Sequence, residues 1–379
     1  MKRLTQALLI LLLLFLSGIL WMWPHYPYLP EASSPWQAQR LSKLPIISDV
    51  AGEGGYININ GPSVIRVPDW VDNPLGAYYL YFAHHKGSYI RLAYADDPAG
   101  PWTLHKKGVL PITASGFPAS FEEVTGGDAG LKELWDTFSV YVVRDYLLLA
   151  YRATVSDPAE RKARGISAAA NKAVHVASPE VLIDQQNQRL VLFYHGFNKN
   201  GGQSSRIATS ADGLNFAPLD ETVFSTYLRA FDHAGQHYLL GMPGVLYRGE
   251  TATGPFKARD KILFEPDMRH AGLLVQGSTL YVFWSRVGDT PERIMLSQVD
   301  LSSPNWDDWV ATAPVDILRP ELAWEGATIP VIASLRGEMD IAAHDLRDPY
   351  VFRDEDGALY LYYVGGGEKA IGVARLSDK

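Results

Sequence analysis

The chain has 379 residues, of which 47% are hydrophobic and 12% aromatic, and its net charge is −8. This composition is typical of a globular protein with a large core, and the acidic balance gives no support for binding nucleic acid. The absence of cysteine excludes disulfides, thiol catalysis and cysteine-based metal sites. Tyr and Trp are abundant, and Gly and Pro are spread throughout, which favours many short strands over long helices.

The first predicted element is an apolar run over Ala7–Trp23, preceded by Lys2 and Arg3. It is typical of an export signal or of a single membrane anchor. Because no small-residue cleavage site follows it, we favour an uncleaved anchor over residues 1–23, with a cleaved signal peptide as the alternative. The two basic residues would stay in the cytoplasm. The protein is therefore predicted to be exported, to the periplasm or outside the cell, with the anchor tethering it to the inner membrane.

Residues 24–54 are rich in Pro, Ser and aromatic residues without periodicity, and are predicted to form a linker or a strap on the domain surface. A repeating unit follows, in which short β-rich runs are joined by Gly-rich or acidic turns. It is clearest over His344–Leu376, which reads HDLRDPYVFRDEDGALYLYYVGGGEKAIGVARL. Earlier copies begin at GPSVIRV, HVASPEVLID, TYLRAFDH and RHAGLLVQ. Several copies end on similar turns, such as Gly100-Pro101-Trp102 and Gly254-Pro255-Phe256.

Copies spaced by about 45 residues or more, with four strands each, are the signature of a β-propeller. The sequence predicts an all-β fold over residues 55–379, a five-bladed propeller of four-stranded antiparallel blades. We expect residues near the start of the domain to supply the outermost strand of the last blade. Residues 113–171 are predicted to be an insertion with a hairpin and a helix, or a sixth blade, and residues 318–343 a long loop. A two-sheet sandwich is the alternative fold.

The segments that open the inner strands of a propeller converge on one mouth of its central channel. Charged residues at these points are costly unless they pair or bind something, so their recurrence suggests a site. Two more candidates, Trp324 and Glu325, lie in the loop before the last copy. The candidates on the strands are Asn60, His175, Glu180, Arg229, Arg269, His270, Asp345, Arg347 and Asp348.

The sequence resembles the five-bladed propeller glycosidases, in particular glycoside hydrolase family 43 and its relatives in families 32 and 68. The resemblance covers about residues 55–376 and is most specific in GPSVIRV, in WEGA at Trp324–Ala327 and in RDPYVF at Arg347–Phe352. The sequence looks most like uncharacterised bacterial proteins that are related to these families. The resemblance implies carboxylate acid/base catalysis in the central channel, without a metal or another cofactor.

Some of the catalytic residues of family 43 have no counterpart in this chain. Family 43 opens its first two blades with Asp-Pro and supplies an acidic Glu from the third, whereas this chain has Gly61-Pro62, Ser178-Pro179 and Arg229 there. The resemblance implies a relocated site in which Glu325 protonates the leaving oxygen and Asp348 acts as base or nucleophile. Glu180 would tune or position these groups.

Other candidates would contact the sugar. In this hypothesis Asn60, His175, Arg229, Arg269, His270, Asp345, Arg347 and Trp324 bind the substrate. Structural roles are the alternative: Asp348 would bond turn amides, Glu325 would pair with an arginine such as Arg336, and the histidines would be core residues. The arginines would either neutralise the carboxylates or bind an acidic sugar.

The sequence thus predicts an exported glycoside hydrolase acting on oligo- or polysaccharides. A non-catalytic carbohydrate-binding propeller is the first alternative, because the first-blade Asp is missing. A lyase acting on uronic-acid polymers through His and Arg is the second. The turn at Asp354–Gly357 resembles the start of a calcium loop but lacks the Glu that would complete it.

Overall fold

The computed structural model describes residues 28–48, 58–85, 87–124, 174–199, 203–223, 225–265, 267–334, 337, 339 and 341–379. The predicted anchor over 1–23 lies outside these residues, and so do the hairpin and helix predicted after residue 124. Within the described ranges no helix is long and apolar enough to span a membrane. The anchor, the export and the membrane tether therefore stay predictions.

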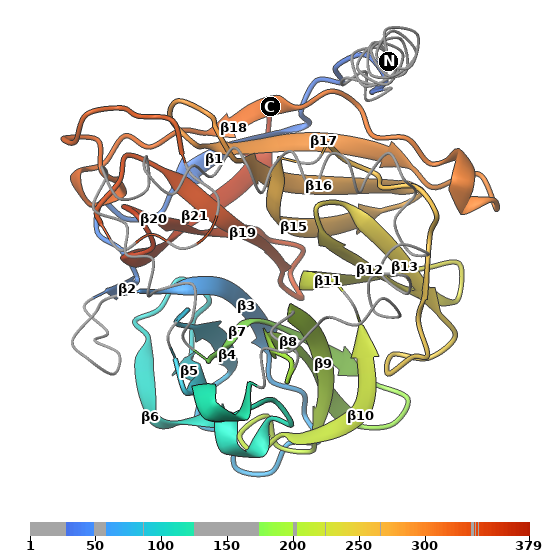
Figure 1. The fold of residues 1–379 in the computed structure, drawn as a ribbon. Helices are drawn as coiled ribbons and strands as arrows, with labels where there is room; N and C mark the ends of the chain where they lie inside the picture. Colours follow the sequence, from blue (N-terminus) through green and yellow to red (C-terminus); the bar gives the residue numbers. More distant parts are fainter. Residues whose placement is uncertain are drawn as a thin grey trace, which may run out of the picture.

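The described strands form five antiparallel sheets around a central axis (Figure 1), which confirms the predicted five-bladed propeller with four-stranded blades. In each blade the strands follow one another in the chain from the axis outward. The first blade consists of β3 (Asn60–Arg66), β4 (Tyr78–Ala83), β5 (Tyr89–Ala95) and β6 (Thr103–Pro111), and the second of β7 (Val176–Asp184), β8 (Arg189–Phe197), β9 (Gln203–Ser210) and β10 (Ala217–Val223). The third consists of β11 (Thr226–His233), β12 (Gln236–Met242), β13 (Val245–Gly249) and β14 (Lys257–Ala258), and the fourth of β15 (Met268–Gln276), β16 (Thr279–Arg286), β17 (Ile294–Asp300) and β18 (Val315–Leu318).

The fifth blade joins the two ends of the described chain. Its inner strands are β19 (Leu346–Arg353), β20 (Leu359–Gly365) and β21 (Ala370–Asp378), and its outermost strand is β1 (Trp36–Arg40). A further short strand, β2 (Ile47–Ser48), also pairs with β21. The predicted closure of the ring by residues near the start of the domain is thus confirmed. Both strands lie within the range predicted as a linker.

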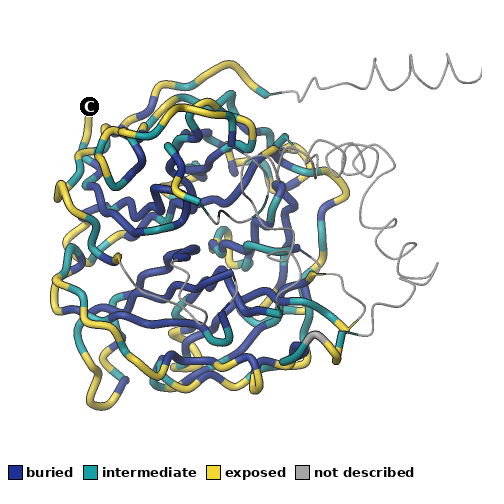
Figure 2. Tube along the Cα trace, turned by 60° about the vertical axis from the view of Figure 1, so that its left-hand side comes forward, coloured by how far each residue is buried: buried dark blue, intermediate teal, exposed yellow. Residues whose placement is uncertain are grey.

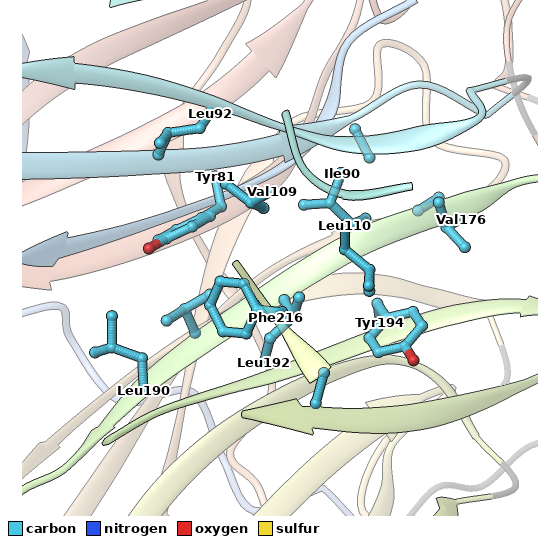
Figure 3. Close-up of a cluster of buried hydrophobic side chains, with 14 of the residues drawn as sticks. Tyr81, Ile90, Leu92, Val109, Leu110, Val176, Leu190, Leu192, Tyr194 and Phe216 are labelled. Atoms are coloured by element: carbon cyan, nitrogen blue, oxygen red, sulfur yellow. The ribbon is translucent and has the colours of Figure 1, made fainter. Parts of the chain in front are cut away.

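The core lies between neighbouring blades. Each blade is covered on both faces, so its central strands are apolar throughout rather than alternating, and all residues of β4 are buried. Separate hydrophobic clusters fill each of the interfaces between adjacent blades. Figure 3 shows the one between the first two blades, where Tyr81 and Phe216 meet at 5.9 Å between ring centroids. Buried positions line the inside of the trace and exposed ones the rim (Figure 2).

The five inner strands share one irregularity near their starts. Each shifts its register against the next strand at the same place, between Asn60 and Ser63 in β3 and between Arg347 and Tyr350 in β19. The same shift occurs in β7, β11 and β15. A bulge of this kind redirects a side chain and ends regular pairing. In four of the five strands a residue in the bulge has positive φ: Gly61 (59°), Ser178 (50°), Tyr227 (56°) and Asp348 (50°).

Candidate active site at the propeller axis

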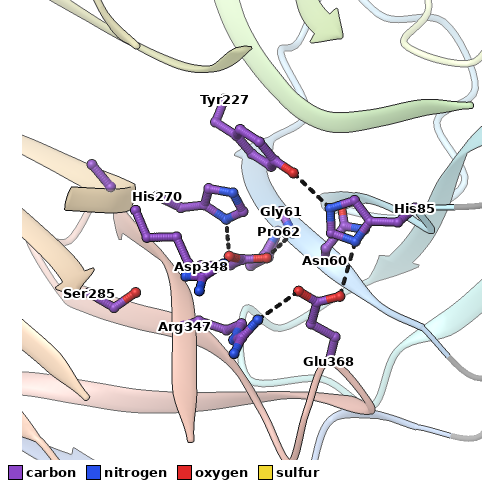
Figure 4. Close-up of polar contacts among 12 residues, drawn as sticks. Asn60, Gly61, Pro62, His85, Tyr227, His270, Ser285, Arg347, Asp348 and Glu368 are labelled. Carbon is purple, nitrogen blue, oxygen red and sulfur yellow. Dashed lines mark hydrogen bonds and ion pairs between the residues drawn. The ribbon is translucent and has the colours of Figure 1, made fainter. Parts of the chain in front are cut away.

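Ten residues form a continuous polar group at the bulged ends of the inner strands, and we call this group the axial cluster. Every member except Tyr227 is buried, and Tyr227 is partly exposed. The members come from all blades but the second, and Figure 4 shows most of them. The axial cluster consists of Asn60, His85, Tyr227, Arg269, His270, Glu292, Asp345, Arg347, Asp348 and Glu368.

The first feature of the axial cluster is a carboxylate paired with an imidazole. Asp348 Oδ1 contacts His270 Nδ1, and Asp348 Oδ2 accepts a hydrogen bond from Gly61 N at 3.0 Å (Figure 4). Since a carboxylate only accepts, the pair places the proton of a neutral His270 on Nδ1. Burial and the positive charge of Arg269 lower the pKa of His270 well below its usual range. His270 therefore presents an unprotonated Nε2.

The second feature is a chain of three groups, Glu368–His85–Tyr227. His85 Nδ1 lies 3.0 Å from Glu368 Oε2, and His85 Nε2 lies 2.7 Å from the Tyr227 hydroxyl. The Tyr227 ring stacks on His270, with centroids 3.6 Å apart and planes inclined by 28°. The two carboxylate–imidazole pairs thus meet at Tyr227 (Figure 4).

An ion network surrounds Arg347 beneath these pairs. Its guanidinium contacts Glu368 at 3.0 Å, Glu292 at 3.2 Å and Asp345 at 2.5 Å. Glu292 also pairs with Arg269 at 2.8 Å. Burial raises the pKa of Asp345, with Arg347 opposing it. For Glu368 burial also acts upward, but His85 and Arg347 outweigh it and hold the pKa well below its usual range, so Glu368 is ionised.

Several buried polar atoms in and beside the cluster have no hydrogen-bond partner among the described residues. Three of them are Asn60 Oδ1, Ser178 Oγ and His195 Nδ1. His195 packs against Tyr227, with ring centroids 4.5 Å apart, and its Nε2 lies 3.4 Å from His175 Nε2. Buried polar atoms usually have a partner, so these three are suited to bind hydroxyl groups of a ligand or ordered water.

Glu180 and Arg229 form a separate pair where the inner strands meet. Arg229 contacts Glu180 at 2.8 Å and donates to three backbone carbonyls of other blades, those of Pro62, Pro179 and Ala271. Burial raises the pKa of Glu180, while Arg229 lowers it. Glu180 also borders a cavity of about 420 Å³ that opens between the far halves of β3, β7 and β19. The pair therefore ties the blades together on the side away from the axial cluster.

The side chains of Glu325 and Trp324 lie against β1 and β20 of the fifth blade and not in the axial cluster, although the Glu325 carbonyl accepts a hydrogen bond from Asp345 N at 3.3 Å. Glu325 is fully buried and binds Arg40 through both oxygens, at 2.7 and 2.8 Å. It also accepts hydrogen bonds from the Tyr363 hydroxyl and from the backbone of residues 321 and 322. Trp324 stacks on Tyr363 at 5.7 Å. These contacts anchor the loop to β1, with Arg40 as the arginine partner. Arg336, the partner named as an example in the sequence analysis, lies outside the described residues.

Many of the predicted site residues are thus brought together. The axial cluster contains Asn60, Arg269, His270, Asp345, Arg347 and Asp348, and His175 lies beside it. Glu180 and Arg229 lie deeper, and Glu325 and Trp324 lie elsewhere. Each of the three predicted arginines is paired with a carboxylate, the first of the two roles expected for them.

Sequence reasoning missed four members of this region, His85, His195, Glu292 and Glu368. His85 ends the aromatic strand β4, and Glu368 follows the glycines of the β20–β21 turn. A His at the end of a strand was the one signal available for His85. In the described part of the chain no group of three or more His, Asp or Glu side chains is arranged to hold a metal ion.

No family model matches the sequence. An uncharacterized protein of Acanthamoeba polyphaga mimivirus is 32% identical over 345 residues, which cover 84% of this chain and 84% of the viral protein. This similarity extends over most of both chains. Because the relative is viral, it does not test the expected likeness to bacterial proteins.

Solved structures of glycoside hydrolases have a similar fold. A glycosyl hydrolase from Bacteroides ovatus gives a TM-score of 0.56 at 10% identity, covering 92% of this chain and 95% of that one. A thermostable family-43 glycoside hydrolase gives 0.50 at 14% identity, covering 88% and 93%. At such identities the likeness shows the fold alone, which is that of the propeller glycosidases.

Proposed function

Since the chain belongs to the same family as the uncharacterized mimivirus protein and has the fold of the propeller glycoside hydrolases, we propose that it cleaves glycosidic bonds at the axial cluster. The observation that carries this proposal is the buried Asp348–His270 pair at the bulge of an inner strand. Glycoside hydrolysis needs a base that activates water on one side of the bond and an acid that protonates the leaving oxygen on the other.

In this proposal Asp348 acts through His270. The carboxylate, fixed by the Gly61 amide, holds the Nδ1 proton of the imidazole and so directs the Nε2 lone pair outward. A neutral imidazole oriented by a carboxylate is the arrangement that enzymes use to accept a proton from a nucleophile. His270 would take the proton of the attacking water. The unpartnered Asn60, Ser178 and His195 atoms would bind sugar hydroxyls.

The site departs from the family-43 pattern in its first three blades. Gly61, Ser178 and Tyr227 occupy bulges where acidic chemistry would be expected, and none is a carboxylate. Asp348 occupies the matching bulge of the fifth blade, from which it would orient the base, His270, of the fourth blade. In place of the predicted role as base or nucleophile, Asp348 would orient His270. Glu325, predicted as the acid, would instead have an anchoring role, because its oxygens are already occupied.

A non-catalytic carbohydrate-binding propeller is the second candidate function. The observation that favours it is the absence of a carboxylate from the bulges of the first three blades. It predicts binding of a glycan without turnover. The three predicted arginines, Arg229, Arg269 and Arg347, give less support to a lyase for uronic acids, since each is engaged by a protein carboxylate.

The test uses the full chain and a panel of plant, algal and bacterial glycans, with new reducing ends as the measurement. We expect the wild type to release reducing ends and Asp348→Asn to lose about 10²–10⁴-fold in rate, because the amide cannot orient His270 as the carboxylate does. Asp356→Asn is the matched control, since Asp356 lies in the exposed β19–β20 turn.

Each other outcome decides against part of the proposal. Glycan binding without reducing ends would favour the binding propeller, and products that absorb in the ultraviolet would favour a lyase. If Asp348→Asn cleaved as fast as the wild type while remaining folded, the Asp348–His270 pair would not supply the base.

A further inference from the structure

We propose that the Tyr227 hydroxyl is the proton donor to the leaving group, supplied with its proton by His85 and Glu368. This inference rests on the proposed function and names the second reacting group, which no carboxylate of the axial cluster is placed to provide. Tyr227 would be a catalytic residue. His85 and Glu368 would act through it as positioning residues.

The contacts of Glu368 determine where the His85 protons are. Glu368 accepts hydrogen bonds from Asn58 at 2.5 Å and from Arg347 at 3.0 Å, so it is a carboxylate with acceptor capacity only. The Nδ1 atom of His85 lies 3.0 Å from Glu368 Oε2 and 3.1 Å from Asn60 Nδ2. Because the hydrogen bond to an ionised carboxylate is the stronger of the two, Glu368 places a proton on Nδ1. Glu368 also stabilises a second proton on the ring, because an ionised carboxylate and an imidazolium in a buried site favour one another. That second proton lies on Nε2, which faces the Tyr227 oxygen at 2.7 Å.

The backbone and the stacking partner fix Tyr227 in this position. Its φ of 56° is uncommon for a bulky residue, and such conformations cluster at functional sites. The ring lies on His270 at 3.6 Å, which sets the direction of the hydroxyl. Tyr227 is also the partly exposed member of an otherwise buried cluster. A substrate that reaches the axial cluster would therefore contact Tyr227.

The two histidines have opposite surroundings. His270 lies near Arg269 and pairs with Asp348, and burial keeps it neutral and ready to accept a proton. His85 lies against the ionised Glu368, 3.0 Å away, and is suited to carry a proton. Pairs of titratable groups with opposed environments are how sites assign the roles of acid and base.

The oxygen of water forms a bond to the anomeric carbon and its proton passes to His270 Nε2. The bond between the anomeric carbon and the glycosidic oxygen breaks, and that oxygen takes the proton of the Tyr227 hydroxyl. His85 then returns a proton from Nε2 to the Tyr227 oxygen, and exchange with solvent moves the proton from His270 back to His85.

The dependence on the leaving group tests this inference. A general acid matters most when the leaving group is a poor one, such as an alkoxide, and least for a nitrophenolate. The substrates are the methyl glycoside and the para-nitrophenyl glycoside of the sugar that the wild type releases. We expect Tyr227→Phe, which keeps the stacked ring, to lose about 10²–10⁴-fold on the methyl glycoside and less than about 10-fold on the nitrophenyl one.

Two further variants separate catalysis from structure. Glu368→Gln should show the same dependence on the leaving group, and it gives the answer if Tyr227→Phe does not fold. Tyr81→Phe is the control, since it also removes a buried hydroxyl. That hydroxyl is remote from the axial cluster and donates a hydrogen bond of 3.0 Å to the Gly213 carbonyl. It should leave both rates unchanged.

The outcomes distinguish the two proposals. If the wild type cleaves neither substrate and no glycan of the panel, the proposed function and the proton donor fail together. If the wild type cleaves both and Tyr227→Phe matches it on the methyl glycoside, the proton donor alone is refuted. An equal loss on both substrates would give Tyr227 a structural role and would also overturn the inference.

Discussion

Single buried carboxylates in this protein differ in what their oxygens contact, and their roles follow from those contacts. Both carboxylate oxygens of Glu325 accept hydrogen bonds, from Arg40, Tyr363 and backbone amides. We expect Glu325→Gln to lower the free energy of unfolding by about 3 kcal/mol, because it leaves Arg40 without its buried charged partner. Urea denaturation of the variant and the wild type measures the difference.

Glu321→Gln is the matched control for that experiment. Glu321 binds the same Arg40 at 2.8 Å, but its side chain is 67% exposed. A pair so exposed contributes less than about 1 kcal/mol. Equal losses in the two variants would contradict the anchoring role. A loss of glycoside cleavage by Glu325→Gln at unchanged stability would return Glu325 to the reaction.

Sequence reasoning works best for residues whose neighbours carry the signal. Asp348 could be predicted because Arg347 and Pro349 place it at the start of an inner strand. His85 and Glu368 could not be predicted as a pair, since 283 residues separate them and only the closure of the ring brings them together. The glycines before Glu368 indicate a turn and say nothing of the direction in which its side chain points.

At the scale of elements, the bulge is what turns each inner strand into part of a site. In a regular strand the side chains point alternately to the two faces of the sheet. A bulge interrupts this alternation, so the faces of residues after the bulge cannot be predicted by counting from residues before it. For this reason the direction of Glu180 could not be deduced from its place in an alternating run, and it meets Arg229 of the neighbouring blade. The bulge itself leaves no sign in the hydrophobic pattern.

Strand β1 closes the ring, and Trp36 is the residue that attaches it. The side chain is 4% exposed and lies 4.5 Å from Tyr281 and 6.0 Å from Phe283 of the neighbouring blade, between ring centroids. We expect Trp36→Ala to lower the free energy of unfolding by about 3–5 kcal/mol, because the cavity left at this interface cannot close fully. Urea denaturation gives the value.

Leu44→Ala serves as its control, since Leu44 follows β1 in the chain but is 73% exposed. It should change the free energy of unfolding by less than about 0.5 kcal/mol. If Trp36→Ala were no more damaging than Leu44→Ala, the packing of Trp36 against the fourth blade would not contribute to closing the ring.

At the scale of the whole molecule, the fold could be predicted because a propeller repeats one interface. Each blade needs apolar strands covered on both faces, and the recurring aromatic runs and turn endings supply that pattern. The same repetition explains what could not be predicted. The copies share a pattern of core residues but carry different residues in their bulges. The pattern therefore predicts where the inner strands lie, but not which functional groups they present at the axis.

The buried polar axis also makes the stability of the whole molecule depend on pH. Burial, aided by His175 for His195 and by Arg269 for His270, lowers both histidine pKa values well below 6.5. These rings bind protons in the unfolded chain before they do so in the folded one. The stability linked to them is therefore complete above about pH 6.5 and is lost as the pH falls below that value. Glu368, whose pKa is also depressed, adds a further loss below about pH 4.5.

We expect the free energy of unfolding in urea to fall between about pH 7.5 and pH 5, and each neutral buried histidine to contribute about 1.4 kcal/mol per pH unit below its unfolded pKa. The raised pKa values of Glu180 and Asp345 act in the opposite direction, so the contribution of one ring is best measured by comparing a variant that lacks it with the wild type.

His195→Gln should reduce the slope of the free energy of unfolding against pH by about 1.4 kcal/mol per pH unit. His237→Gln, which removes a ring paired with the exposed Asp232, should leave it unchanged. A His195→Gln slope equal to that of the wild type would mean that His195 is not held neutral at the axis.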